Sequence, residues 1–259
     1  MNEVTAAVKL TGKNVIVTGG NSGIGLGIAQ ALNKAGATGF IVGRNPETLS
    51  SAKKSLNGNF QSLECDVTDN EQLDSLFDTV ERTSGKLDVL VVNAGGAIGA
   101  GSIQAFETFD EASYDAMTAL NLRSVFFTVQ KSLPVLKDGA SIILIASIAV
   151  HKGFPGMSVY AACKAGVRSL ARTLSAELMP RGIRVNVVSP GTIDTPVFNR
   201  LGMTDEQASQ AKQQFVDLIP VGRIGQPKDI GSAVTFLASD DSSFMIAEEL
   251  IVDGGVVNL

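Results

Sequence analysis

The chain has 259 residues, of which 44% are hydrophobic, and its formal net charge is −5. This length can bury a large core within one domain, predicted over residues 1–259, and the acidic balance without a basic stripe argues against nucleic-acid binding. No apolar run of about 18 residues and no N-terminal targeting pattern is visible, so we expect a cytoplasmic protein without membrane contact.

Apolar, β-branched runs alternate with stretches of helical apolar spacing along the whole chain. Strands are predicted at 13–18, 39–43, 60–64, 87–93, 141–147, 183–189 and 249–253. This alternation predicts an α/β fold, a Rossmann-like doubly wound parallel sheet with helices on both faces. A polar helical pattern at about 204–220 is expected to lie on a substrate flap at about 192–220 that closes over a ligand.

A glycine-rich turn follows the first predicted strand. It reads Thr18-Gly19-Gly20-Asn21-Ser22-Gly23-Ile24-Gly25, and a helical pattern opens near Ile24. Glycines let the backbone approach a phosphate, which can then bind the N–H groups and the positive dipole end of a helix. The turn predicts a dinucleotide site, although a tight strand-to-helix connection could use the same glycines.

The second predicted strand ends at Gly43 and is followed by Arg44. A carboxylate near this position would accept the ribose hydroxyls of NAD, whereas a guanidinium suits a 2′-phosphate. We therefore predict NADP(H) over NAD(H), with a partial preference because Asn21 and Ser22 add no charge. The alternative is that Arg44 is only an exposed turn residue. Gly39 is unusual inside a strand, where it gives up side-chain packing.

Polar and small residues follow the ends of several predicted strands. Parallel strands bring their carboxyl ends to one edge of the sheet, where ligands of such folds bind. A capping box from Thr68 to Glu71 predicts the start of the next helix. Six residues are expected to meet at this edge: Gly19, Gly43, Asp66, Asn93, Ser147 and Pro190.

Tyr160 and Lys164 are four residues apart and share one face of a predicted helix, with Ser147 thirteen residues before the tyrosine. At ~4 Å two charges interact by ~4 kcal/mol if the effective dielectric constant is ~20. That energy is roughly three pKa units, which would bring the pKa of Tyr160 towards neutrality, where a general acid works best. The alternative is an ordinary amphipathic helix with a solvated lysine.

Seven motifs in order resemble the short-chain dehydrogenase/reductase family of about 250 residues. They are Thr18-Gly19-x-x-x-Gly23-x-Gly25, Asp66-Val67, Asn93-Ala94-Gly95, Asn121, Ser147, Tyr160-x-x-x-Lys164 and Pro190-Gly191. The resemblance implies an NAD(P)-dependent oxidoreductase that forms homotetramers or homodimers. Enoyl reductases of that family usually place six residues between tyrosine and lysine, so they fit poorly.

The resemblance also implies residue roles. Tyr160 would donate the proton, Ser147 would polarise the carbonyl, Lys164 would lower the pKa of Tyr160, and Asn121 would anchor a water. Asp66 could instead serve only as a helix-entry residue, and Asn121 could merely interrupt its helix. The implied cofactor contacts are Gly19, Asn21, Ser22, Gly23, Ile24, Gly25, Arg44, Asp66, Val67, Asn93, Tyr160, Lys164, Pro190, Ile193 and Thr195.

The substrate pocket is expected to use residues 96–102, 151–157 and 192–215, which carry few charges. This predicts reduction of a small apolar ketone or aldehyde; the alternatives are oxidation of a specific alcohol and a non-catalytic nucleotide-binding scaffold. His151 could hydrogen-bond a substrate or simply face solvent. Cys163 could be a reactive thiol beside Lys164 or a buried filler. One histidine and two distant cysteines predict no metal site.

Overall fold

A computed structural model describes residues 9–97, 103–196 and 205–259. In these residues seven parallel strands form one sheet in the order β3-β2-β1-β4-β5-β6-β7, which confirms the predicted fold class. The strands are β1 (Asn14–Thr18), β2 (Thr38–Gly43), β3 (Phe60–Glu64), β4 (Leu87–Val92), β5 (Leu136–Ile145), β6 (Arg184–Pro190) and β7 (Glu249–Val252).

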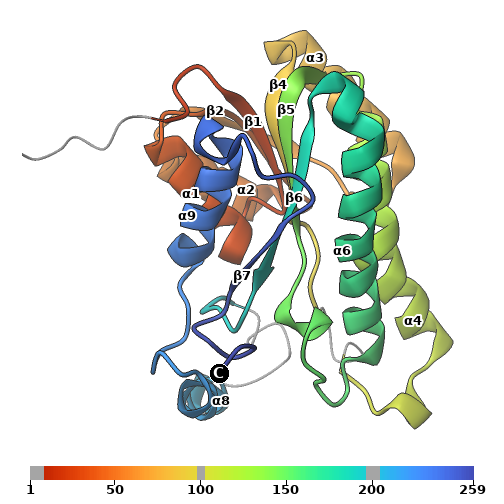
Figure 1. Cartoon of the computed structure of the whole chain (residues 1–259), viewed down its shortest axis with the longest axis vertical. Coiled ribbons are helices and arrows are strands. Elements are labelled where there is room, and N and C mark those ends of the chain that lie inside the picture. Colours follow the sequence, from red (N-terminus) through yellow and green to blue (C-terminus); the bar gives the residue numbers. More distant parts are fainter. Residues whose placement is uncertain (1–8, 98–102, 197–204) are drawn as a thin grey trace, which may run out of the picture.

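Helices cover both faces of the sheet (Figure 1). They are α1 (Gly23–Lys34), α2 (Pro46–Ser55), α3 (Asn70–Ser84), α4 (Glu111–Thr118), α5 (Ser124–Ser132), α6 (Ser158–Leu178), α8 (Asp205–Leu218) and α9 (Pro227–Ala238). One buried cluster joins α1, α2 and α9 to the sheet, and another joins α3, α5 and α6 to the opposite face. The strands are nearly continuous apolar runs because both of their faces are buried.

The strand order reverses between β1 and β4. From β1 the chain builds outward to β2 and β3, then returns to add β4 to β7 on the other side. A crevice opens at such a switch point, beyond the carboxyl ends of the strands. In Figure 1 this edge points down, toward α8 and the C-terminus.

The fifth strand differs most from its prediction of 141–147. It begins at Leu136, which pairs with Leu87, and a register irregularity follows between Leu87 and Val89. The prediction missed this first part of the strand because Lys137, Asp138 and Gly139 do not follow an apolar strand pattern. The strand ends at Ile145, so Ser147 lies beyond it, as the N-cap of the short 3-10 helix η4 (Ile148–Val150).

Two residues, one within β2 and one just before β7, have positive φ angles. Gly39 has φ +151°, and a Cβ atom there would lie 1.8 Å from the carbonyl oxygen of Val15 in β1, so a side chain cannot fit. Ala247, just before β7, has φ +60°. The left-handed conformation costs roughly 1–2 kcal/mol for a residue with a Cβ.

The helix after β3 starts one residue later than the predicted capping box. Asp69 is the N-cap of α3, and its carboxylate accepts from the N–H groups of Glu71 and Gln72. Thr68 instead donates to Asp66 through both its N–H and its hydroxyl. Aspartate displaces threonine because its two oxygens can cap the backbone and also accept from the Gln72 side chain.

The polar helix expected near 204–220 is α8. Residues 197–204 of the predicted flap lie outside the described residues. None of the helices described is both long enough and apolar enough to cross a bilayer.

Candidate functional site

One cavity of about 940 Å³ lies at the carboxyl edge of the sheet. All six residues expected to meet there lie on its wall. So do all the predicted cofactor contacts, namely Gly19, Asn21, Ser22, Gly23, Ile24, Gly25, Arg44, Asp66, Val67, Asn93, Tyr160, Lys164, Pro190, Ile193 and Thr195. The geometry brings these residues together, while their roles stay predictions.

The glycine turn forms a cradle that has no room for side chains. A Cβ atom on Gly25 would lie 2.1 Å from the carbonyl oxygen of Gly19 and 2.5 Å from Nδ2 of Asn93. Asn93 holds the turn, because its Nδ2 donates to the carbonyl oxygen of Thr18 over 3.0 Å. Helix α1 begins at Gly23, and the side chain of its N-cap residue, Ser22, does not cap it. The N-terminus of α1 therefore presents backbone N–H groups to the cavity, which fits a pyrophosphate.

Arg44 and Asp66 contact each other at one end of the cavity. The guanidinium Nη1 of Arg44 lies 3.3 Å from Oδ2 of Asp66, and the two side chains are 58% and 30% exposed. Burial raises the pKa of Asp66, but hydrogen bonds from Thr68 and the charge of Arg44 outweigh it and leave the pKa below its ordinary value. In this structure Asp66 therefore serves both as a helix-entry residue and as the partner of Arg44.

The same end includes two residues that the sequence reasoning missed. Asn45 and Thr48 line the cavity, where Asn45 caps α2 by accepting from the N–H of Thr48. The Thr48 hydroxyl in turn accepts from Nδ2 of Asn21 over 2.7 Å. The pattern Asn-Pro-x-Thr is a helix N-cap signal with proline at N1, and it could have placed this helix start beside Arg44.

Ser147, Tyr160 and Lys164 meet at the other end. Nζ of Lys164 lies 5.8 Å from the centre of the Tyr160 ring and donates to the carbonyl oxygen of Ile145 over 2.8 Å. The lysine is 3% exposed, and burial lowers its pKa from 10.5 to about 8. It is therefore a desolvated amine beside the phenol ring, not a solvated surface lysine.

The expected lowering of the Tyr160 pKa is wrong for this geometry. Burial raises the pKa of the phenol above its ordinary value, and a hydrogen bond with Ser147 offsets only part of that rise. The reason is burial of the phenol, which disfavours its charged form. The Lys164 ammonium donates to a backbone carbonyl of β5 from beside the ring. Ser147 also accepts from the N–H of Ala149 over 3.2 Å, which fixes its hydroxyl at the start of η4.

Asn121 lies within a single π-helical turn (Ala119–Arg123) between α4 and α5 and is fully buried. Its Oδ1 accepts from the N–H of Gly96, and its Nδ2 donates to the carbonyl oxygens of Gly96 and Met117. It interrupts the regular helix, as the alternative interpretation has it, and it also holds the loop after β4 beside Lys164. A Cβ atom on Gly95 would lie 2.9 Å from Oδ1 of Asn121 and 3.3 Å from Nζ of Lys164.

Apolar side chains line the cavity beyond the serine and tyrosine. They come from four separate stretches of the chain, and the carbonyl oxygen of Gly156 accepts from the N–H of Gln104 to join two of them. Residues 98–102 and 197–204 of the predicted pocket lie outside the described residues. The apolar lining residues are Ile103, Phe154, Met157, Ile193 and Phe215.

The surroundings of His151 and Cys163 do not match the reactive roles that the sequence left open for them. Nε2 of His151 lies 2.9 Å from Oε1 of Glu249 in β7, and the side chain is 31% exposed and is not among the residues that line the cavity. Cys163 is 2% exposed, and burial raises the pKa of its thiol, which fits the buried-filler interpretation.

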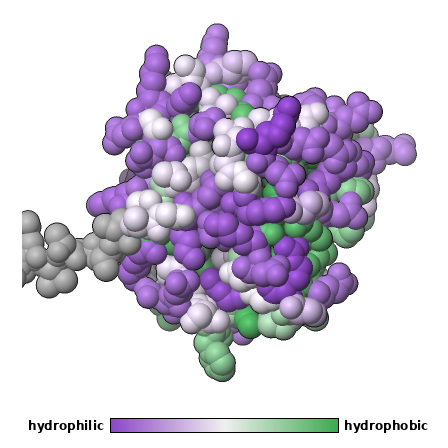
Figure 2. Space-filling view, turned by 90° about the horizontal axis from the view of Figure 1, so that it is seen from above, coloured by the Kyte–Doolittle hydropathy of each residue, from purple (hydrophilic) through white to green (hydrophobic). Residues whose placement is uncertain are grey.

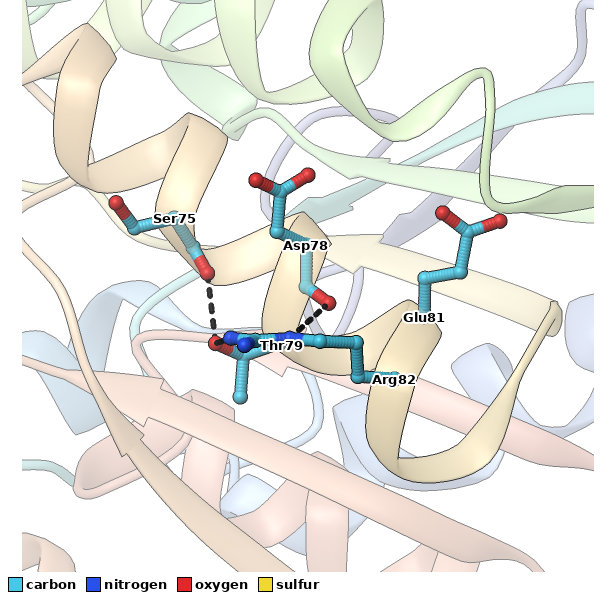
Figure 3. A pocket seen from close by; sticks show the side chains of 5 residues that line it. All are labelled: Ser75, Asp78, Thr79, Glu81 and Arg82. Atoms are coloured by element: carbon cyan, nitrogen blue, oxygen red, sulfur yellow. Dashed lines mark hydrogen bonds between the residues drawn. The ribbon is translucent and has the colours of Figure 1, made fainter.

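A second hollow, of about 360 Å³, lies on the outer side of α3. Its hydrogen bonds stay within the helix, from Thr79 to the carbonyl oxygen of Ser75 and from Arg82 to Asp78 and Thr79 (Figure 3). Figure 3 shows the carboxylates of Asp78 and Glu81 turned away from Thr79, so polar groups do not converge there. Figure 2 looks onto the amino edge of the sheet, where the surface is mostly hydrophilic. Within the described ranges, no group of three or more His, Cys, Asp or Glu side chains could hold a metal ion.

Comparison with known proteins shows the family to which the chain belongs. A family model described as enoyl-(acyl carrier protein) reductase matches residues 18–257. An oxidoreductase of Sarocladium schorii is 37% identical, with 99% of this chain and all of that protein covered. A 3-oxoacyl-[acyl-carrier-protein] reductase of Thermotoga maritima is 34% identical, covering 96% of this chain and 100% of that one.

Two further matches extend this picture. An NADP-dependent (R)-specific alcohol dehydrogenase of Lentilactobacillus kefiri is 35% identical, covering 95% of this chain and 97% of that protein. The crystal structure of a dehydrogenase/reductase from Sinorhizobium meliloti has a TM-score of 0.87 at 31% identity, with 98% of both chains covered. Together, the fold and the matches identify an oxidoreductase with a Rossmann-like parallel sheet. The chain belongs to the short-chain dehydrogenase/reductase family.

Proposed function

We propose that the protein uses NADPH to reduce a small apolar ketone or aldehyde to an alcohol, reversibly. The observation that carries the proposal is the meeting of Ser147, Tyr160 and Lys164 at the apolar end of the cavity whose other end carries Arg44. An NADP-dependent alcohol dehydrogenase among the relatives supports the same chemistry.

The reaction needs a proton donor and a hydrogen bond at the carbonyl oxygen. When bound, the reduced nicotinamide supplies the hydride. Tyr160 donates its phenolic proton to the oxygen, and Ser147 stabilises the negative charge that grows there. A raised phenol pKa keeps Tyr160 protonated, as a general acid must be before the transfer. Lys164, as an ammonium close to the ring, stabilises the phenolate that the transfer leaves.

Residues at the two ends of the cavity would hold the cofactor. The glycine turn and the N-terminus of α1 suit the pyrophosphate, and Asn93 supports that turn. Arg44 would contact the 2′-phosphate, because its guanidinium is exposed at the cavity end and carries the charge that a phosphate prefers. This is the basis for proposing NADP(H) over NAD(H).

Enoyl reduction is the second candidate, because the matching family model carries that description. Tyr160 and Lys164 lie four residues apart on α6, so the lysine reaches the tyrosine ring from one helical turn away. We favour carbonyl reduction, since Ser147 and Tyr160 are joined by a hydrogen bond and form a paired donor set for one oxygen atom.

The test follows NADPH and NADH oxidation separately with the purified protein against apolar ketones, aldehydes and α,β-unsaturated thioesters. We expect turnover of a ketone or aldehyde with NADPH and a lower kcat/KM with NADH. Turnover confined to the thioester carbon–carbon double bond would favour the second candidate. Absence of turnover across the panel, with NADPH still bound, would favour a nucleotide-binding scaffold.

The matched control is Tyr160→Phe, which removes one hydroxyl and keeps the ring. General acid catalysis contributes about 10²- to 10⁴-fold, so kcat should fall by that factor while the Kd for NADPH changes less than a few-fold. If the variant kept more than a few per cent of the wild-type kcat, Tyr160 would not be the acid.

We also propose that the protein forms homodimers or homotetramers. Support comes from large apolar side chains at the surface, with Phe106 85% exposed and Phe126 43% exposed. Such side chains are frequent in subunit interfaces. Light scattering of the purified protein measures its mass directly, and a monomer at micromolar concentration would contradict this proposal.

A further inference from the structure

Four elements of the fold meet on one carboxylate, that of Glu249 at the start of β7. Its Oε1 lies 2.9 Å from Nε2 of His151, in the loop that follows β5. Its Oε2 accepts from Nε of Arg168 in α6 over 2.9 Å. The Ser189 hydroxyl in β6 also donates to Oε1. Glu249 therefore links β6, α6 and the loop after β5 to the last strand.

The carboxylate at the centre of this cluster is largely shielded from water, whereas the His151 side chain is 31% exposed. The Glu249 side chain is 9% exposed and the Arg168 side chain 18% exposed. Burial raises the pKa of Glu249, but its hydrogen bonds with Ser189 and His151 and its contact with Arg168 outweigh burial and lower the pKa. The carboxylate is therefore ionised at neutral pH. A buried charge of this kind stays in place only while its partners stay in place.

The partners of Glu249 are on the two segments that carry the proposed catalytic groups. His151 follows Ser147 by four residues, at the end of η4, which Ser147 caps. Arg168 follows Lys164 by four residues in α6, the helix that also carries Tyr160. The carboxylate thus fixes the loop of the serine against the helix of the tyrosine and the lysine.

We propose that His151, Glu249 and Arg168 form a positioning cluster that sets the distance between the Ser147 hydroxyl and the Tyr160 phenol. The inference rests on the proposed function for its effect on turnover. None of the three touches the reacting atoms, so none is a catalytic residue. They keep two hydrogen-bond donors aimed at one oxygen, and a misplacement of about 1 Å can cost about 100-fold in rate.

A second contact reinforces this arrangement. Nζ of Lys152 lies 3.4 Å from the carbonyl oxygen of Val256 in the segment after β7. That segment also accepts from the N–H of Val221, just after α8, through the carbonyl oxygen of Gly254. The end of the chain therefore contacts both the loop of Ser147 and the segment that follows α8.

The experiment compares His151→Ala with His151→Gln, whose Nε2 can replace the imidazole Nε2 as a donor to Glu249. We expect His151→Ala to lower kcat about 10-fold or more. KM for the ketone and Kd for NADPH should change less than threefold. His151→Gln should recover kcat to within about threefold of wild type. Glu249→Gln tests the acceptor, and Glu248→Gln, its exposed neighbour just before β7, is the control for charge loss at the adjacent position.

A crystal structure of His151→Ala gives a readout that does not depend on turnover. We expect the hydrogen bond between Ser147 and Tyr160 to be lost or lengthened in it. An unchanged Ser147–Tyr160 contact would overturn the inference, whether or not the wild type turned over any of the substrates. Absence of turnover in the wild type would contradict the proposed function, which is a separate outcome. Equal kcat in His151→Ala and wild type, or equal damage in the alanine and glutamine variants, would also overturn it.

Removal of Glu249 leaves Arg168 buried beside no other acidic partner among the described ion pairs, so Glu249→Gln also reports on folding. The effects of His151→Ala and Glu249→Gln on kcat should not add, because both variants break the same pair. Additive losses would mean that the two residues act separately and would contradict a shared positioning role.

Discussion

The two ends of the cavity hold charge in opposite ways. At the catalytic end, Lys164 is 3% exposed, and burial lowers its pKa to about 8. At the other end, the Arg44 side chain is 58% exposed and pairs with Asp66 at 3.3 Å. A buried charge costs stability and is sensitive to small displacements, whereas an exposed ion pair contributes about 0–1 kcal/mol. Changes at the first end should therefore have larger effects than changes at the second.

The largest effect is expected from Lys164→Met, which keeps the side-chain length and removes the charge. Without an ammonium to stabilise the Tyr160 phenolate, kcat should fall about 10²- to 10⁴-fold. The same change should raise the free energy of unfolding at pH 7 by on the order of 2 kcal/mol. Removing a charge that folding desolvates stabilises the protein, and this gain exceeds the stability lost with one hydrogen bond. Steady-state assays and urea unfolding measure the two. A variant that is both inactive and less stable would contradict this account.

The pH dependence of stability sharpens the same point. Lys164 has a pKa of about 8 in the folded protein against an ordinary value of 10.5, so the unfolded chain binds more protons between these values. The destabilisation by the buried ammonium is fully present below about pH 8 and disappears as the pH rises to about 10.5. The difference in unfolding free energy between wild type and Lys164→Met should shrink over that range. A constant difference would show that Lys164 is not desolvated.

Ser147→Ala is expected to have the next largest effect. Removing one donor to a developing oxyanion costs about 10²- to 10³-fold in kcat. Binding of NADPH should be unchanged, because the hydroxyl points to Tyr160 and Ala149. Isothermal titration calorimetry with NADPH provides the control. A loss of NADPH binding equal to the loss of kcat would place Ser147 in the cofactor site instead.

At the exposed end, Arg44→Ala should weaken NADPH binding about 10- to 100-fold, the range for a lost hydrogen bond to a charged group. The Kd for NADH should stay within about twofold, since NADH has no 2′-phosphate. Fluorescence titration with each cofactor measures the difference. Equal losses for NADPH and NADH would mean that Arg44 does not distinguish them.

The smallest effect is expected from Asp66→Asn. The carboxylate competes with a phosphate for Arg44, and the amide keeps an oxygen that can accept from Thr68. NADPH binding should tighten by no more than about fivefold, because an exposed pair contributes about 0–1 kcal/mol. Weaker binding of both cofactors would instead point to a direct cofactor contact by Asp66, the role that the family resemblance implies.

Sequence reasoning succeeded where it depended on strand ends. The six residues predicted to gather at one edge do so, since a parallel sheet aligns all of its carboxyl ends. It failed for the pKa of Tyr160, because spacing places Lys164 on the correct helix face but does not show that the phenol itself is buried, which raises its pKa. Spacing also does not give the direction of the Lys164 ammonium, which donates to the carbonyl oxygen of Ile145 in β5, nineteen residues away.

The sequence by itself determined the alternating pattern of strands and helices, the glycine turn and the shared helix face of Tyr160 and Lys164, because these depend on local periodicity and backbone sterics. Only the tertiary structure decided which partners meet across long separations. The contact of Arg44 with Asp66 spans 22 residues, and that of His151 with Glu249 spans 98. Local periodicity gives no signal for a contact across either of these sequence separations. Such pairs form because packing of the sheet brings together side chains that are remote in the sequence.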